Sequence, residues 1–161
     1  INGISQLLKT NENSIIEKIT SLNNDKKKVE KELNNLKNKN LSSVDQSENI
    51  IKIGNIKFIS KVLNNIPPNN LKGIVDNYLL KETNCVTALL SVDGKKISLV
   101  VGVTNDLSHK INAIDLVKIG SSIFGGKGGG GRPTMAQSGG SDINATQKTI
   151  DGLVGYIKNL D

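Results

Sequence analysis

The sequence predicts an α+β protein, with an N-terminal helical, coiled-coil-like extension followed by a small globular domain of sheet and helices that carries a glycine-rich loop. Two observations predict this division. Apolar residues recur at helical spacing in the first 41 residues. From residue 50 onward, short apolar runs bounded by turn residues alternate with amphipathic helical segments. We therefore expect a helical segment over residues 1–41 and a globular domain over residues 42–161.

The helical segment begins with a capping-box pattern, Ser14-Ile-Ile-Glu17, in which serine and glutamate side chains each satisfy a free backbone amide. Residues 1–9 are expected to end a separate short helix. An apolar stripe with alternating spacings of four and three residues then follows, with Lys26 at the one position of the series that is not apolar. Its apolar members are Ile15, Ile19, Leu22, Val29, Leu33 and Leu36. This stripe needs a partner, which is another helix of a longer parent chain, a second copy, or the globular domain.

The globular domain is predicted to contain four strands and three helices. Turn signals at Gly54-Asn55 and Asp93-Gly94 separate two pairs of strands: Ile50–Ile53 from Ile56–Val62, and Cys85–Val92 from Ile97–Thr104. Cys85–Val92 is apolar throughout its middle, so we expect it to be central in the sheet. The helices are predicted after a cap at Asn70, after a cap at Asn112, and over Asn144–Leu160.

The charge of the chain favours a polyanionic partner. The net charge is +6 over 161 residues. Residues 1–49 carry eight lysines and seven acids, whereas residues 50–161 carry thirteen basic and eight acidic residues, so the excess lies in the globular domain. This balance favours nucleic acid or a membrane surface. No stretch approaches the ~20 apolar residues of a membrane span, so no membrane partner is expected.

The rare reactive residues argue against catalysis. Cys85 is the one cysteine and His109 the one histidine, so neither an intrachain disulfide nor a structural zinc site with about four Cys or His ligands is expected. Cys85 is interpreted as a small core residue and His109 as a loop residue. A reducing, cytoplasmic location fits this cysteine usage and the lack of a recognisable signal peptide. Because the chain begins at Ile1, it is interpreted as a fragment of a longer protein.

The segment Gly125–Gly131 contains six glycines in seven positions, and Arg132-Pro133 follows. Glycine lets another backbone or a polyanion approach closely, and arginine offers a planar fork of donors to phosphates. The pattern also satisfies G-x-G-x-x-G, but it follows a predicted helix instead of a strand, and it lacks the Gly-Lys-Ser/Thr ending of a phosphate-binding P-loop. A disordered linker is the plain alternative. The candidate binding residues are Gly126, Lys127, Gly128, Gly129, Gly130, Gly131, Arg132, Gln137 and Lys110.

The motif Gly128-Gly-Gly-Gly-Arg-Pro-Thr-Met-Ala-Gln-Ser-Gly-Gly140 resembles the signature near the C-terminus of alanyl-tRNA synthetases, in their DHHA1-type globular domain. The strand pair within residues 86–107 and the helix within residues 113–120 are similar to that domain as well. Thr134 stands where this family often has an acidic residue, and Ser138 where it often has alanine.

The resemblance implies a non-catalytic role for this fragment. The parent enzyme uses ATP to join alanine to its tRNA and hydrolyses mischarged tRNA at a zinc site, so ATP, Mg and Zn are expected only in parts of the parent that precede this chain. No catalytic residue, metal ligand or cofactor is expected here. The C-terminal domain is expected to bind the elbow of tRNA(Ala), to link aminoacylation with editing alongside the other domains of the synthetase, and to contribute to a homodimer.

Three alternatives stay open at this point. The chain is similar in its glycine motif to the substrate-binding domain of DHH-type phosphoesterases, although there the glycines usually lead into histidine and here Arg132 follows. A pure oligomerisation module would depend on the apolar stripe of the helical segment. A free-standing enzyme would need a set of reactive residues that the sequence does not offer.

Overall fold

A computed structural model describes residues 15–41 and 48–160, and the chain divides into two compact units, Ile1–Ser43 and Val44–Asp161. In the first unit, helix α2 runs over Ile15–Leu41. The expected short helix over residues 1–9 lies outside the described residues. The pairing of α2 in a coiled coil stays a prediction. None of the described helices is both long enough and apolar enough to cross a membrane.

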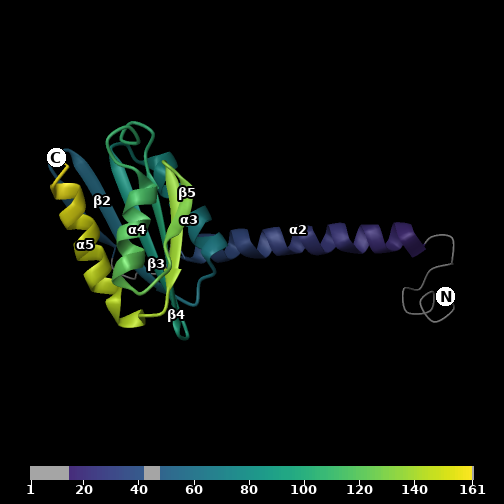
Figure 1. The fold of residues 1–161 in the computed structure, drawn as a ribbon. Helices are drawn as coiled ribbons and strands as arrows, with labels where there is room; N and C mark the ends of the chain where they lie inside the picture. The colour runs from purple at the N-terminus through teal and green to yellow at the C-terminus, as the bar shows by residue number, and fades with distance from the viewer. Residues whose placement is uncertain (1–14, 42–47, 161) are drawn as a thin grey trace. The chain divides into compact units, whose positions relative to one another are not determined.

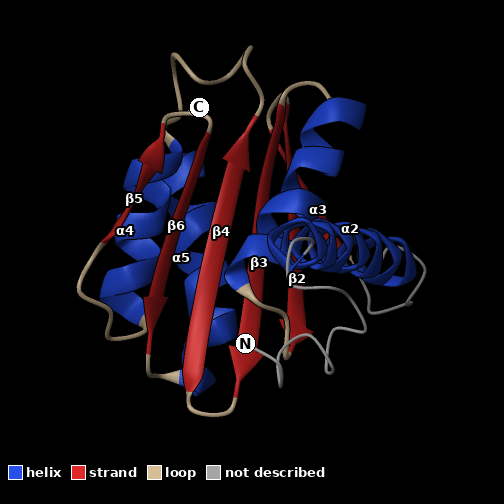
Figure 2. Cartoon of the chain, turned by 90° about the vertical axis from the view of Figure 1, so that its right-hand side faces the viewer, coloured by secondary structure: helices blue, strands red, loops and turns tan. Residues whose placement is uncertain are grey.

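The second unit contains one mixed sheet of six strands in the order β1-β2-β3-β4-β6-β5 (Figure 2). The strands are β1 (Asn49–Ile53), β2 (Ile56–Asn64), β3 (Cys85–Asp93), β4 (Lys96–Val103), β5 (Gly129–Arg132) and β6 (Met135–Gly140). Only β2 and β3 pair in parallel among the described strands. The four predicted strands and the interior position of β3 are confirmed.

Helices cover both faces of this sheet (Figure 1). Helix α3 (Pro68–Lys81) connects the parallel strands β2 and β3 and packs on one face. Helices α4 (Ala113–Ile123) and α5 (Thr146–Lys158), the latter preceded by a short 3-10 turn η2 (Ile143–Ala145), pack on the other. Alternate residues of the strands therefore meet two different apolar layers. The larger layer lies under α4 and α5 and is built mainly from Ile, Leu and Val, as the composition requires.

The local signals that define the elements are mostly those predicted. Both two-residue turns carry a glycine at positive φ, with Gly54 at 52° and Gly94 at 58°. The Asn112 side chain accepts a hydrogen bond from the backbone N–H of Ile114 at 2.9 Å and so caps α4. The expected cap at Asn70 is wrong, because α3 begins two residues earlier at Pro68. Proline suits a first helical position, where its missing N–H has no partner to lose.

Helix α3 packs closely on the sheet because β4 offers it a glycine. A Cβ added at Gly102 would collide with Val75 and lie 3.0 Å from Leu79 Cδ1, both of which belong to α3. Gly102 is buried, so neither helix nor strand can move aside without opening a gap elsewhere. The separation of α3 from β4 is therefore fixed by the absence of one side chain.

We predict that Gly102→Ala destabilises the globular unit by about 1–3 kcal/mol, because overpacking forces α3 away from the sheet. Urea unfolding followed by circular dichroism measures this change. Gly155→Ala is the matched control, since a Cβ there meets nothing within 4 Å on α5. It should be neutral or stabilising by up to about 1 kcal/mol through helix propensity. Equal stability of the Gly102→Ala protein and the wild type would contradict the close-packing account.

Candidate nucleic-acid interface

Residues 125–128 form a loop, as predicted, but residues 129–140 form a β-hairpin, which corrects the prediction of a loop there. Strand β5 (Gly129–Arg132) pairs antiparallel with β6 (Met135–Gly140), and β6 pairs in turn with β4. Pro133 and Thr134 form the turn between them. Sequence reasoning missed these strands because glycine has low strand propensity and the run has no apolar alternation. The hairpin extends the sheet and makes β5 its edge strand.

Hydrogen bonds hold both ends of the hairpin to the domain. At the turn, the carbonyl oxygen of Pro133 accepts from the N–H of Ala113 at 2.9 Å, and that of Thr134 accepts from Val103 at 2.9 Å. At the other end, the buried hydroxyl of Ser121 accepts from the N–H of Gly128 at 2.8 Å. The segment that looked most like a flexible linker is thus fixed to α4 and β4.

Two glycines of β5 allow close packing, Gly129 against α4 and β6 and Gly131 against β6. A Cβ at Gly129 would lie 2.7 Å from the carbonyl oxygen of Gln137 and 2.8 Å from Val117 Cγ2 of α4. A Cβ at Gly131 would lie 2.9 Å from the Cβ of Ala136 and closer still to the backbone of β6. No larger residue fits at either position, and Gly131 also has a φ of 155°, a backbone conformation that favours glycine.

Gly130 is different, because it points to the opposite face and nothing lies within 4 Å of where its Cβ would be. Its φ is not positive, so the backbone conformation does not demand glycine either. On this face no helix within residues 48–160 covers β6 and β5, whereas α4 and α5 lie behind them (Figure 2). A glycine that neither packing nor conformation requires suits the close approach of a ligand.

An open groove of about 480 Å³ occupies this uncovered face, which we call the glycine groove. Its lining residues are Lys72 from α3 and, from the hairpin, Gly130, Gly131, Arg132, Met135, Ala136 and Gln137. The side chains of Lys72, Arg132 and Gln137 have no hydrogen-bond or ion-pair partner among the described residues. The groove therefore offers the Lys72 and Arg132 cations and the Gln137 amide, all unpaired among the described residues. They lie beside Gly130 and Gly131, which carry no side chains.

The structure gathers four of the nine predicted binding residues in this groove: Gly130, Gly131, Arg132 and Gln137. Gly126, Lys127, Gly128 and Gly129 precede it along the chain and do not line it. Lys110 is exposed in the segment between β4 and α4 and does not line it either. Lys72 was missed, because a lysine on the polar side of an amphipathic helix carries no sequence signal of its own.

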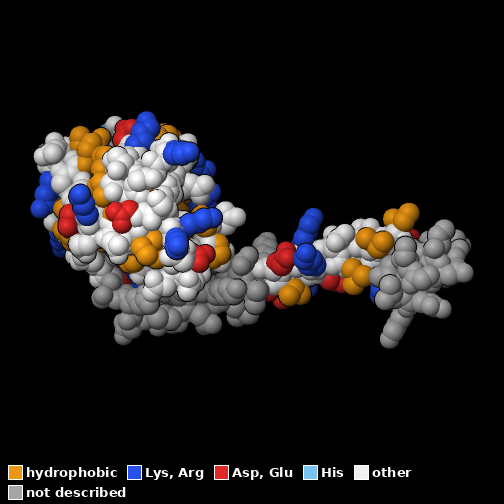
Figure 3. Space-filling model, turned by 60° about the horizontal axis from the view of Figure 1, so that its bottom comes forward, with side chains coloured by type: hydrophobic (Ala, Val, Ile, Leu, Met, Phe, Trp, Pro, Cys, Tyr) orange, Lys and Arg blue, Asp and Glu red, His pale blue; other side chains and the backbone are white. Residues whose placement is uncertain are grey.

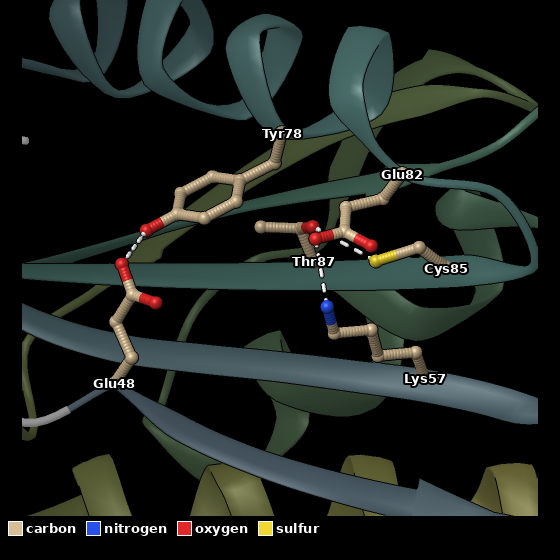
Figure 4. Close-up of polar contacts among 6 residues, drawn as sticks. All are labelled: Glu48, Lys57, Tyr78, Glu82, Cys85 and Thr87. Atoms are coloured by element: carbon tan, nitrogen blue, oxygen red, sulfur yellow. Dashed lines mark hydrogen bonds and ion pairs between the residues drawn. The ribbon is translucent and has the colours of Figure 1, made fainter.

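A second set of polar side chains lies around the start of β3, and these side chains form hydrogen bonds with one another (Figure 4). The Lys57 ammonium donates to the Glu82 carboxylate at 2.7 Å, and this bond raises the pKa of Lys57. Burial, together with donation to Glu48, raises the pKa of the Tyr78 phenol. Burial also raises the pKa of the Cys85 thiol, which keeps it protonated and unreactive. Cys85 is a core residue, as predicted.

His109 and the acidic residues of the described part of the chain form no metal-binding cluster. His109 is exposed. Over residues 15–41 and 48–160, no three His, Cys, Asp or Glu side chains gather where they could hold a metal ion. Asp106 instead accepts from the backbone N–H of Asn84 at 2.7 Å, and hydrogen bonds lower the pKa of its carboxyl. Asp106 therefore ties the start of β3 to the segment after β4.

Comparison with known proteins decides the family. Residues 55–159 match the DHHA1 domain, a region that includes every strand from β2 to β6 and the helices α3 to α5. The chain belongs to the DHHA1 domain family. This result confirms the resemblance that the glycine-arginine-proline motif predicted.

The curated relatives of this DHHA1 chain are alanine–tRNA ligases. It is 40% identical over 136 residues to the enzyme from Paramagnetospirillum magneticum, which covers 84% of this chain and 16% of the ligase. It is 42% identical over 159 residues to that from Haemophilus influenzae, with coverage of 97% and 18%. The chain thus spans less than one fifth of the length of these relatives.

Solved structures agree with the DHHA1 assignment. The C-Ala domain of Aquifex aeolicus alanyl-tRNA synthetase superimposes with a TM-score of 0.66 at 25% identity, covering 68% of this chain and 98% of that domain. RecJ from Thermus thermophilus has a TM-score of 0.54 at 12% identity, over 91% of this chain and 19% of RecJ. The second likeness shows a shared fold only. The predicted α+β class is confirmed by the match to C-Ala.

We predict that Ser138→Ala stabilises the DHHA1 domain by up to about 1 kcal/mol. The Ser138 hydroxyl is the one buried side-chain polar atom in the described part of the chain without a hydrogen-bond partner, and a buried unsatisfied group costs about 1–3 kcal/mol. Thermal unfolding monitors the change. Ser121→Ala should act in the opposite direction, because it removes the acceptor that holds Gly128. A Ser138→Ala protein that melts below the wild type would refute this account.

Proposed function

We propose that this chain is the C-terminal domain of an alanine–tRNA ligase and that it binds tRNA(Ala) at the elbow without catalysing a reaction itself. The glycine groove carries this proposal. It places Lys72 and Arg132, both uncommitted, beside the side-chain-free surface at Gly130. The names of the relatives supply the identity of the nucleic acid.

The groove suits a folded RNA backbone better than stacked single bases. Lysine and arginine hold phosphates by charge and hydrogen bonds, without reading sequence. Single-strand binding usually relies on aromatic platforms, yet only 2% of this chain is aromatic and no aromatic side chain lines the glycine groove. Recognition by shape and charge is typical of proteins that bind structured RNA.

The remaining parts of the proposal concern the parent enzyme. Holding the elbow would let the aminoacylation and editing centres use one bound tRNA, with the other domains of the synthetase as partners in the cytoplasm. ATP, Mg and Zn belong to those domains in this proposal. The hypothesis that the chain is the substrate-binding domain of a DHH-type phosphoesterase is supported only by a shared fold. Arg132 also stands where that class usually has histidine.

We predict that Arg132→Ala weakens tRNA(Ala) binding about five- to tenfold and lowers the salt dependence of log K by about one unit, because one phosphate contact is lost. Fluorescence anisotropy across a salt series measures both. Lys127→Ala should weaken binding less, since Lys127 lies outside the glycine groove.

Lys148→Ala is the matched control for charge. Lys148 is exposed on α5, which lies on the face of the sheet opposite the glycine groove. An unrelated tRNA and a plain RNA duplex test selectivity. If Arg132→Ala binds like the wild type, the groove is not the binding surface. If the wild type binds no RNA even at low salt, the domain bridges or dimerises the parent enzyme instead.

A second role, in oligomerisation, is favoured by α2. Apolar side chains of the stripe are exposed on this helix (Figure 3), with Val29 at 62% of its full accessibility. Ile19 and Leu22 are 43% and 45% exposed. Residues at such spacing gain stability by burial against a second helix. We propose that this stripe pairs with a second copy or with helices of the parent chain.

We predict that removal of residues 1–41 converts a self-associated chain into a monomer. Sedimentation equilibrium of the whole chain and of residues 42–161 compares the two masses directly. The truncated chain should keep its affinity for tRNA(Ala), because the glycine groove belongs entirely to the second unit. A dimer that persists after truncation would place its interface in the globular domain, and a monomeric whole chain would leave the helices of the parent chain as the partner of the stripe.

A further inference from the structure

A second, smaller pocket adjoins the glycine groove. Its volume is about 210 Å³, and its lining residues include Asp76, Leu79 and Leu80 from α3, Val103 from β4, and Asn105 just beyond β4. Arg132 lines both this pocket and the glycine groove. The two cavities are therefore neighbours with one shared cation between them.

The lining of this pocket combines apolar and polar side chains. Leu79 and Val103 supply hydrocarbon surface, and Leu80 adds a side chain that is 85% exposed. The side chains of Asp76 and Asn105 have no partner among the residues the structure describes. An apolar lining with a few hydrogen-bonding groups is typical of sites that hold a small ligand.

The carboxylate of Asp76 identifies which part of an RNA fits. Asp76 lies one helical turn from Lys72 on α3, so it faces the same region as the cations that attract phosphate. A carboxylate repels phosphates and therefore opposes backbone binding. It is favourable toward RNA where it accepts hydrogen bonds, either from N–H groups on the edge of a base or from a ribose hydroxyl. The apolar side chains of Leu79, Leu80 and Val103 in the same pocket favour the base.

We infer that this base pocket holds one unpaired, amino-bearing nucleobase of the RNA whose backbone occupies the glycine groove. The phosphate next to that base lies at Arg132, the ring lies between the leucines and Val103, and Asp76 accepts from the base edge. Guanine fits best, because its ring N–H and amino group lie side by side and match the two carboxylate oxygens, whereas uracil has no amino group. This inference rests on the proposed function.

The direction in which Asp76→Asn changes the affinity for tRNA(Ala) tests the inference. Asp76→Asn keeps the shape and removes the charge. If Asp76 accepts from a base, the variant should bind tRNA(Ala) about tenfold more weakly, despite the loss of a negative charge, because hydrogen bonds to charged groups are the strong ones. If Asp76 only repels phosphates, the variant should bind more tightly. Asp93→Asn is the control, since Asp93 is exposed at the opposite end of β4.

The base itself is tested with mononucleotides on the isotope-labelled 161-residue chain. GMP should shift the backbone amide signals of Asn105 and Thr134 more than UMP does, and Asp76→Asn should abolish this preference. Equal shifts from GMP and ribose 5-phosphate would overturn the base pocket, as would unchanged or tighter tRNA binding by Asp76→Asn. In either case wild-type binding to tRNA(Ala) would leave the proposed function standing. Failure of the wild type to bind any tRNA would overturn both.

Discussion

The close packing of the glycine hairpin against α4 is the constraint on which the binding surface depends. Because Gly129 and Gly131 carry no side chains, β5 can approach both Val117 and the backbone of β6. This approach adds two strands to the sheet beyond β4 without a further helix to cover their other face. One face of the hairpin therefore packs against α4, while the other face is not covered by any described helix of this unit.

The position of Arg132 follows from this arrangement. Its two neighbours along the turn, Pro133 and Thr134, are hydrogen-bonded through their carbonyl oxygens to α4 and β4. The guanidinium therefore extends from a fixed stretch of backbone, and it loses less conformational entropy on binding than it would on a free loop. Rigidity at this point lets one cation serve both the glycine groove and the base pocket.

Much of the fold could be predicted from the sequence because its signals are local. The paired strands around Gly54 and Gly94, the cap at Asn112 and the interior strand beginning at Cys85 all depend on neighbouring residues. The glycine hairpin could not be predicted in this way. Its strands are stabilised by contacts with Val117 and Ser121, which belong to a different element, so the local composition indicated a loop.

In the candidate site, too, some residues could be predicted from local signals and others depend on contacts between distant elements. Arg132 and Gly130 were predicted from residue chemistry, and the structure places both in one groove. Lys72 joins them only because the crossover from β2 to β3 places α3 over the neighbouring strands, which is a property of the sheet topology. Conversely, Lys110 and Lys127 carry the same charge as Lys72 and Arg132 but lie outside the groove. A residue that is near a motif in the sequence need not lie on the same surface of the folded domain.

The edge position of β5 also bears on how the protein avoids aggregation. An exposed edge strand offers unpaired backbone groups that can recruit strands from other molecules. Here the edge is four residues long, three of them glycine, and a cation stands at its end. Glycine has low strand propensity and provides no apolar side chains for an incoming strand to pack against. The composition that opens a surface for one partner thus makes the same edge a poor template for amyloid-like growth.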